Sequence, residues 1–216
     1  METLFGEELI KSIAFDEGEI LRGIRRLYVP DWIELDPCYS IGRFYTEYGM
    51  PHPKYRFDIK PQAPGVEMRS AENMPFENET IKSIMFDPPF LGSSGDGLDK
   101  DDESSKIIKR FGSFRNVPEL WTWYYKCMAE YYRVLAPGGV LVFKCQDTVS
   151  QNKNRFSHCF IMNAAIEIGF NPKDLFILLA KMRMVPDWHK ENQFHARKFH
   201  CYYWIFIKEK SRVDYN

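Results

Sequence analysis

The chain has 216 residues, of which 44% are hydrophobic and 27% are charged, and its formal net charge is −1. These values are typical of one globular domain with additions and exclude a disordered or collagen-like chain, while a nucleic-acid partner would have to be attracted by a local patch. No apolar run reaches the ~20 residues of a membrane span, and the acidic start does not resemble a signal peptide, so we expect a cytoplasmic protein with no membrane partner.

The first thirty residues are predicted to be helical. The apolar side chains that recur at helical spacing are Leu9, Ile13, Ile20, Ile24 and Leu27. Asp16 followed by Glu19 resembles a capping box, so we expect a short helix to end near Phe15 and a second helix to begin there.

Four short strands are predicted next, at residues 32–35, 55–59, 66–69 and 81–86. Residues 91–116 have no period, and their glycines, serines and acids predict a mobile loop. A long helix is predicted from Asn116, because several apolar residues then recur at helical spacing. Its expected buried face consists of Leu120, Tyr124, Cys127, Met128, Tyr131 and Leu135.

The remaining chain alternates strand and helix, with a strand at 140–145, a loop at 147–155, a helix at 155–168 ended by Gly169, and strands at 175–180 and 202–207. This alternation predicts an α/β sheet covered on both faces. No helix separates the last two strands, so we expect them to pair antiparallel.

The most informative peptide is Asp87-Pro88-Pro89-Phe90, which follows the strongest predicted strand. Ligands of open α/β sheets bind outside the carboxyl ends of the strands. Asp87 and the Pro88 carbonyl can accept both hydrogens of an exocyclic amino group, while Phe90 stacks on the base that carries it. The alternative is a buried strand end followed by a rigid turn.

The peptide resembles the [DNS]-P-P-[YFW] motif of the class I S-adenosylmethionine-dependent methyltransferases, in the branch that methylates amino groups of DNA bases, in a phage or prokaryotic variant. Segments 33–45, 57–59, 69–76 and 130–139 resemble four further motifs in the family's order, and the last has the pattern E-x-x-R-V-L-x-P-G-G. The resemblance implies a Rossmann-like seven-stranded sheet, mostly parallel with an antiparallel last strand, and helices on both faces. The expected organisation is an N-terminal helical extension at 1–30 and a methyltransferase domain at 31–210.

The resemblance also implies an S-adenosylmethionine site around the first strand. The residues expected to bind this cofactor are Asp36, Pro37, Cys38, Tyr39, Ser40, Gly42, Phe44, Tyr45, Asp58, Ile59, Ala71, Glu72 and Asp87. Asp36 would accept from the methionine ammonium and Asp58 from the ribose hydroxyls, whereas Ser40 departs from the family's glycine. The alternatives are a strand-end turn residue for Asp36, an Asx turn for Asp58 and a solvated loop charge for Glu72.

Residues 181–200 carry five lysines and arginines against two acids, with aromatic residues between them. This composition suits a surface that holds phosphates and stacks bases. The residues expected to bind the substrate are Lys144, Trp188, His195, Arg197 and Lys198. The alternatives are a solvated hairpin for the segment and a polar strand-end cap for Lys144. The histidines and the five cysteines form no ligand pattern, so we predict neither a metal site nor a disulfide framework.

The predicted function is methyl transfer from S-adenosylmethionine to an exocyclic amino group in DNA, with Asp87, Pro88, Pro89 and Phe90 as the catalytic motif. An aspartate at the first motif position favours adenine N6 over cytosine N4 in this family. RNA or a protein amide is an alternative substrate, and a non-catalytic binding protein is the alternative of another class. The short chain leaves little room for a separate recognition domain, so a partner protein or a second copy of the chain is a further possible source of target recognition.

Overall fold

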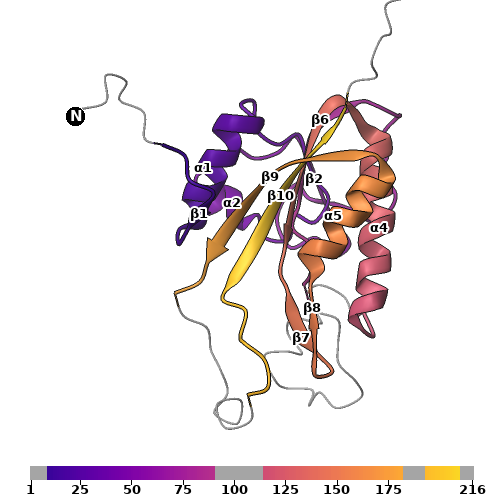
Figure 1. The fold of residues 1–216 in the computed structure, drawn as a ribbon. Helices are drawn as coiled ribbons and strands as arrows, with labels where there is room; N and C mark the ends of the chain where they lie inside the picture. Colours follow the sequence, from indigo (N-terminus) through magenta and orange to yellow (C-terminus); the bar gives the residue numbers. More distant parts are fainter. Residues whose placement is uncertain (1–8, 91–113, 182–192, 210–216) are drawn as a thin grey trace, which may run out of the picture.

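The computed structural model describes residues 9–90, 114–181 and 193–209 (Figure 1). Its helices are α1 (Glu17–Tyr28), α2 (Arg43–Thr46), α4 (Val117–Val134) and α5 (Ser157–Ile168). Its strands are β1 (Ile13–Ala14), β2 (Leu35–Asp36), β3 (Tyr55–Asp58), β4 (Glu67–Met68), β5 (Ile81–Phe86), β6 (Leu135–Cys145), β7 (Thr148–Ser150), β8 (Lys153–Arg155), β9 (Phe170–Leu179) and β10 (His200–Lys208). Most of the predicted loop at 91–116, together with Trp188, lies outside the described residues. No described helix has both the length and the apolar character needed to cross a membrane.

One eight-stranded sheet forms the centre of the fold, in the order β1-β9-β10-β6-β5-β2-β3-β4. Neighbouring strands are parallel except on either side of β10, which is antiparallel to both β9 and β6. The predicted Rossmann-like fold with an antiparallel last strand is therefore confirmed. The seven predicted strands correspond to β2, β3, β4, β5, β6, β9 and β10, and the structure adds β1 at the edge.

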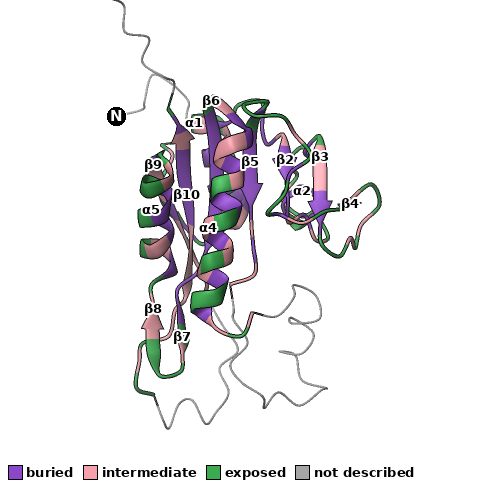
Figure 2. Ribbon diagram, turned by 90° about the vertical axis from the view of Figure 1, so that its right-hand side faces the viewer, coloured by how far each residue is buried: buried purple, intermediate pink, exposed green. Residues whose placement is uncertain are grey.

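Two apolar clusters cover the two faces of the sheet. Figure 2 shows buried central strands behind helices α4 and α5. Alternate residues of each central strand point to opposite clusters, because successive side chains of a strand face opposite sides. In β6, Leu141 and Phe143 pack under α4 and α5, whereas Val142 packs on the other side with Leu21 and Ile24 of α1. The sheet is thus covered by helices on both faces, as predicted.

The long helix α4 buries five of the six residues predicted from its spacing, and the sixth, Leu135, is also buried but begins β6. Asn116 caps it by accepting from the Glu119 N–H at 2.9 Å. At the end of α5, Gly169 takes a φ of 114° and donates to the carbonyls of Ala165 and Ile166. The predicted helix ends are confirmed because their capping residues make the predicted bonds.

The first of the two predicted N-terminal helices is absent from the described residues 9–15, and residues 1–8 lie outside the described part of the chain. Ile13 and Ala14 form strand β1, which pairs in parallel with Ile177 and Leu178 of β9. The second helix is confirmed, and Asp16 caps it by accepting from the Glu19 N–H at 2.8 Å. The segment before residue 30 packs against the rest of the chain, because β1 extends the sheet and α1 belongs to one of its apolar clusters.

Several other boundaries differ from the prediction, and the strand predicted at 140–145 begins earlier, at Leu135 of β6. The strand predicted at 32–35 is reduced to β2, because Trp32 has a left-handed φ of 69° and cannot continue a strand. Strand β9 starts at Phe170, ahead of its apolar part, because it pairs along β10 back to Lys208. The loop predicted at 147–155 is a hairpin, in which β7 and β8 are joined through Gln151 and Asn152.

Candidate active site at the carboxyl edge of the sheet

The sheet has a topological switch point between β2 and β5. From β2 the chain moves to β3 and β4 on one side, and it then returns to β5 and β6 on the other. Ligands of open α/β sheets bind at such a point, outside the carboxyl ends of the strands. Asp36 ends β2 and Asp87 directly follows β5, so two carboxylates flank the switch point.

Asp36 is buried, with 2% of its surface exposed. Its Oδ1 accepts from the Cys38 N–H at 3.0 Å, and its Oδ2 accepts from the Tyr45 hydroxyl at 2.7 Å. Both bonds come from the turn and helix α2 that follow β2, so the local sequence fixes the direction of the carboxylate. This geometry includes the strand-end turn that was the alternative explanation for Asp36, and it also leaves the carboxylate beside the switch point.

The turn after β2 has two left-handed residues, Ser40 at φ 53° and Gly42 at φ 69°. Ser40 adopts this conformation, which favours glycine, while its N–H donates to Asp58 Oδ2 at 2.8 Å. The other oxygen of Asp58 accepts from the Lys60 N–H at 2.7 Å. Asp58 therefore supports the turn from the end of β3, and a carboxylate with about four lone-pair positions can still accept from a ligand.

The electrostatics of Asp36 are unusual. Burial, together with the neighbouring carboxylates of Asp87 and Asp58, raises its pKa to about 7, although the bonds from Tyr45 and Cys38 act in the opposite direction. Among the described residues, no lysine, arginine or histidine forms an ion pair with Asp36. A buried carboxylate without a cationic partner suits a ligand that brings a positive charge.

The peptide after β5 is held from two sides. The Tyr124 hydroxyl of α4 donates to the Pro89 carbonyl at 2.5 Å, and Lys144 Nζ of β6 lies 3.4 Å from Asp87 Oδ2. The Asp87 side chain is half-buried, with 28% of its surface exposed. Phe90 is also half-buried, and its ring centroid lies 5.9 Å from Lys144 Nζ. The peptide thus presents a carboxylate, a rigid backbone and an aromatic ring at one edge.

Lys144 does not face solvent, since only 12% of its side chain is exposed. Its Nζ lies 2.7 Å from Glu17 Oε1 as well as 3.4 Å from Asp87. Burial by itself would lower the pKa of this ammonium, but the carboxylates of Asp87 and Glu17 outweigh burial and raise the pKa above its ordinary value. Lys144 thus forms ion pairs with Glu17 and the motif aspartate, and its substrate-binding role stays a prediction.

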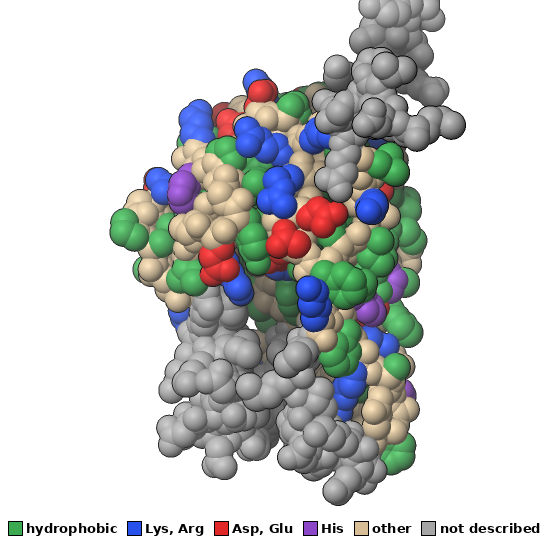
Figure 3. Space-filling view, turned by 90° about the vertical axis from the view of Figure 1, so that its left-hand side faces the viewer, with side chains coloured by type: hydrophobic (Ala, Val, Ile, Leu, Met, Phe, Trp, Pro, Cys, Tyr) green, Lys and Arg blue, Asp and Glu red, His purple; other side chains and the backbone are tan. Residues whose placement is uncertain are grey.

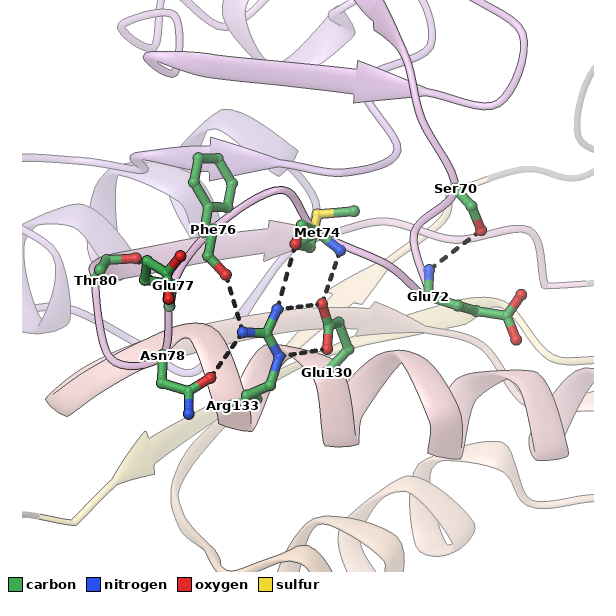
Figure 4. A network of polar contacts seen from close by, with 9 residues as sticks. All are labelled: Ser70, Glu72, Met74, Phe76, Glu77, Asn78, Thr80, Glu130 and Arg133. Atoms are coloured by element: carbon green, nitrogen blue, oxygen red, sulfur yellow. Dashed lines mark hydrogen bonds and ion pairs between the residues drawn. The ribbon is translucent and has the colours of Figure 1, made fainter.

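Two residues near the end of α4 hold the segment that runs beside the site (Figure 4). Glu130 accepts from the Met74 N–H at 2.8 Å and from Arg133 at 2.7 Å. The Arg133 guanidinium also donates to the Phe76 carbonyl at 2.9 Å and to Asn78 Oδ1 at 2.8 Å. The E-x-x-R pair seen in the sequence therefore fixes residues 74–78 against the sheet.

The residues predicted around that segment occupy different environments. Ala71 is buried, Ile59 is 54% exposed, and Glu72 forms a surface ion pair with Lys126 at 3.8 Å. Met74 is buried and Phe76 packs against the Phe57 ring, so both are core residues. Glu72 thus has the solvated environment that was its alternative explanation.

The substrate residues predicted at 195–198 lie on the β7–β8 hairpin. His195 Nε2 is 2.8 Å from the Asn152 carbonyl oxygen, and its Nδ1 is 3.3 Å from Asn154 Nδ2. Lys198 Nζ lies 5.7 Å from the Phe156 ring centroid. Arg197 is half-buried in the same segment, residues 193–198, which is called the strap below. The hairpin continues β6 past the end of the sheet, as Figure 1 shows. The basic residues of this segment therefore lie beyond the carboxyl edge of the sheet, against a hairpin that follows Lys144 closely in the sequence.

The described side chains on the face that carries α1 have both signs of charge. Lysine and arginine side chains alternate there with aspartate and glutamate, as Figure 3 shows. A polyanion is attracted by a patch of one sign, so the hairpin side of the molecule is the better candidate for nucleic acid. The described residues contain no cluster of three or more His, Cys, Asp and Glu that could hold a metal ion.

Residues 81–216 match the model of a family described as DNA methylase, of the N6 and N4 type. The chain belongs to this DNA methylase family. The matched region starts with β5 and includes Asp87, Lys144 and the hairpin, whereas the predicted cofactor turn at 36–45 precedes it.

Solved structures with similar folds include methylases. A cytosine-N4-specific PvuII DNA methyltransferase matches with 16% identity and a TM-score of 0.45, over 62% of this chain and 44% of that chain. A Thermus thermophilus protein assigned as a DNA modification methylase matches with 16% identity and a TM-score of 0.41, over 63% and 48%. TrmN from Thermus thermophilus matches with 11% identity and a TM-score of 0.49, over 88% and 48%. The chain thus spans about half the length of these proteins, and no curated protein matches it.

One group at this candidate site could not be predicted from the sequence. Glu17 of α1 reaches Lys144 and thereby the motif aspartate. In the sequence it is one of two acidic residues in the first turn of an amphipathic helix, which is where acids commonly stabilise a helix. Its local sequence gives no sign of the contact with Lys144.

Proposed function

We propose that this DNA methylase family member transfers a methyl group from S-adenosylmethionine to an exocyclic amino group of a base in DNA, with adenine N6 as the target. The observation that carries the proposal is the position of Asp36 and Asp87-Pro88-Pro89-Phe90 on the two sides of the switch point. The aspartate at the first motif position supports adenine over cytosine N4.

The residues at the end of β2 fit the cofactor. S-adenosylmethionine supplies an electrophilic methyl group on a sulfonium and also carries an ammonium. The buried carboxylate of Asp36, which has no cationic partner among the described residues, would accept from that ammonium. At Gly42 the backbone has no room for a side chain, because a Cβ there would lie 2.3 Å from the Tyr39 hydroxyl oxygen. Asp58 would accept from the ribose hydroxyls.

The motif residues would orient the amine. An exocyclic amino group is a weak nucleophile because its lone pair is delocalised into the ring. Asp87 and the Pro88 carbonyl would accept its two hydrogens and favour the pyramidal geometry in which the lone pair points outward. Among the described residues the Pro88 carbonyl accepts no hydrogen bond, whereas the Pro89 carbonyl is bonded to Tyr124. Catalysis would then come from orientation and electrostatics, without a covalent enzyme intermediate.

The hairpin and the strap at 193–198 would hold the DNA. Lys153, Arg155, Arg197 and Lys198 supply positive charge there, and Phe194 is 81% exposed. Exposed aromatic rings among cations suit a strand whose bases stack on protein. A base in a duplex would have to be flipped out to reach Asp87.

The ionisation of Asp36 predicts opposite effects of one substitution on thermal stability and on cofactor binding. Its folded pKa of about 7 exceeds the ordinary value of 3.8, so the folded protein binds an extra proton between these pH values. Stability from this group falls as the pH rises through that window, by up to about 1.4 kcal/mol per pH unit. We expect Asp36→Asn to raise the Tm of the ligand-free protein at pH 8 more than at pH 5, and to weaken S-adenosylmethionine binding at pH 8 at least about tenfold. Thermal melts and calorimetric titration measure the two effects, and a lower Tm for Asp36→Asn at pH 8 would contradict the assignment.

The proposed activity is tested by incubating the protein with labelled S-adenosylmethionine and a mixture of unmodified DNA and RNA, then resolving the nucleosides by mass spectrometry. Label in N6-methyladenine from DNA supports the proposal. Label in N4-methylcytosine or in an RNA nucleoside keeps the chemistry and corrects the target. Absence of label with the cofactor bound would overturn the activity and favour a binding protein.

A further inference from the structure

Lys144 is a buried cation between two carboxylates from distant parts of the chain. Glu17 lies in α1 and Asp87 follows β5, and the side chains of Lys144 and Glu17 are only 12% and 10% exposed. The aromatic rings of Phe44 and Tyr203 lie 4.8 and 5.5 Å from its Nζ. Burying an ammonium is costly unless it is paired and hydrogen-bonded, so this arrangement needs both carboxylates.

The two contacts are unequal. Lys144 Nζ is 2.7 Å from Glu17 Oε1, a short charge-assisted hydrogen bond, but 3.4 Å from Asp87 Oδ2, at the long end of the range. The ammonium is therefore fixed mainly by Glu17. Asp87 is oriented by it through the weaker contact.

Glu17 is itself held in place. The Tyr203 hydroxyl of β10 donates to it, and Tyr48 provides a further hydrogen bond. Burial by itself would raise its pKa, but the Lys144 ammonium and these hydroxyl groups lower the pKa below its ordinary value. Glu17 also lies in the first turn of α1, where the helix dipole favours a negative charge. The chain thus keeps an ionised carboxylate behind Lys144.

We propose that Lys144 and Glu17 are positioning residues for Asp87. Lys144 directs the Asp87 carboxylate toward the amino group. Glu17 holds the Lys144 ammonium and keeps it from moving closer to Asp87. This inference rests on the proposed function, because it assigns a role for the same site. Its consequence is that the N-terminal segment at 13–28 is part of the catalytic unit rather than an appendage.

The test compares Lys144→Met and Glu17→Gln with Lys208→Met. Lys208 is a matched control because it is also a buried lysine. Its Nζ lies 3.0 Å from Glu79 Oε1 and 4.7 Å from the Tyr132 ring centroid. It lies at the opposite end of β10 from His200. We expect Lys144→Met to lower kcat by about 10- to 100-fold and Glu17→Gln by about 10-fold, with KM for DNA and Kd for S-adenosylmethionine changed less than about twofold. Lys208→Met keeps the wild-type kcat per folded molecule.

A second measurement does not depend on activity. The carboxyl carbon of Asp87 is followed by ¹³C NMR across pH, with its resonance identified by its absence in Asp87→Asn. The charged and titratable groups around Asp87 and Lys144 are Glu17, Asp36, Cys38, Tyr45, Tyr124, Cys201 and Tyr203. Removing the cation in Lys144→Met is expected to raise the Asp87 titration midpoint by about one pH unit, whereas Glu17→Gln, which removes a negative charge, lowers it.

The two proposals fail differently. If the wild type methylates no nucleic acid, the proposed function fails, and the NMR titrations still decide the inference. If the wild type is active but Lys144→Met and Glu17→Gln keep its kcat and leave the Asp87 midpoint unchanged, the positioning role is overturned. If Lys144→Met does not fold, Glu17→Gln alone decides, because it retains the lysine.

Discussion

Asp87→Asn is expected to lower kcat for methyl transfer by about 10³-fold. The substitution keeps the size of the side chain but replaces one acceptor oxygen by an NH₂ group, which cannot accept from the exocyclic amine. It also removes the charge that would stabilise the amine as positive charge develops on it. Single-turnover kinetics with labelled S-adenosylmethionine measure the loss without interference from product release.

Asp174→Asn is the matched control for this prediction. Asp174 is also a half-buried carboxylate that accepts from a tyrosine, Tyr28, at 2.5 Å, but it lies in β9 away from the switch point. We expect it to retain wild-type kcat while changing stability. Equal kcat for wild type and Asp87→Asn, with methylation still occurring, would remove Asp87 from the catalytic motif.

The parts of the fold that were predicted correctly are those whose cause is local. Strand β5 was predicted to the residue because a short apolar run ends at two prolines, and α4 was predicted because its buried residues recur with the helical period. The antiparallel pairing of β9 and β10 was predicted because the sequence between them shows no helical pattern. Each of these signals lies within a short stretch of the sequence.

The parts that were missed depend on distant contacts. Ile13 and Ala14 have too few residues to display a strand pattern, and they are extended only because β9 lies beside them. The β7–β8 hairpin turns at Gln151 and Asn152, a pair that lacks the glycine of the commonest two-residue turns. The role of Glu17 depends on α1 packing over β6, which no local pattern encodes.

The site was predicted in its positions but not in all its contacts. Asp87 was selected because it follows the strongest predicted strand, and Asp36 and Asp58 were selected from the resemblance to methyltransferase motifs. The structure places all three at the carboxyl edge. Lys144 was selected as a strand-end cation, and its placement there was correct. Its partner Glu17 was not predictable, because the sequence around this lysine would be the same whether its side chain contacted DNA or Glu17.

Gly42→Ala is expected to destabilise the protein by about 3 kcal/mol and to weaken S-adenosylmethionine binding at least about tenfold. A φ of 69° costs an alanine about 1 kcal/mol, and overpacking adds about 1–3 kcal/mol. The new Cβ would lie 2.3 Å from the Tyr39 hydroxyl oxygen. The Tyr39 ring cannot easily move, because it stacks on Tyr45 at 5.2 Å and its hydroxyl is 2.7 Å from His52 Nδ1.

Gly49→Ala separates the two contributions. Gly49 has nearly the same φ, 66°, but a Cβ there meets nothing within 4 Å. We therefore expect Gly49→Ala to lose only the ~1 kcal/mol of backbone strain and to bind the cofactor normally. The effect at Gly42 should reach the cofactor site because Tyr39 stacks on Tyr45, whose hydroxyl donates to Asp36. Urea unfolding and calorimetric titration measure both variants. Equal losses in the two would mean that the Tyr39 contact contributes nothing, whereas partial recovery of binding in Gly42→Ala combined with Tyr39→Phe would show that this hydroxyl transmits the effect to Asp36.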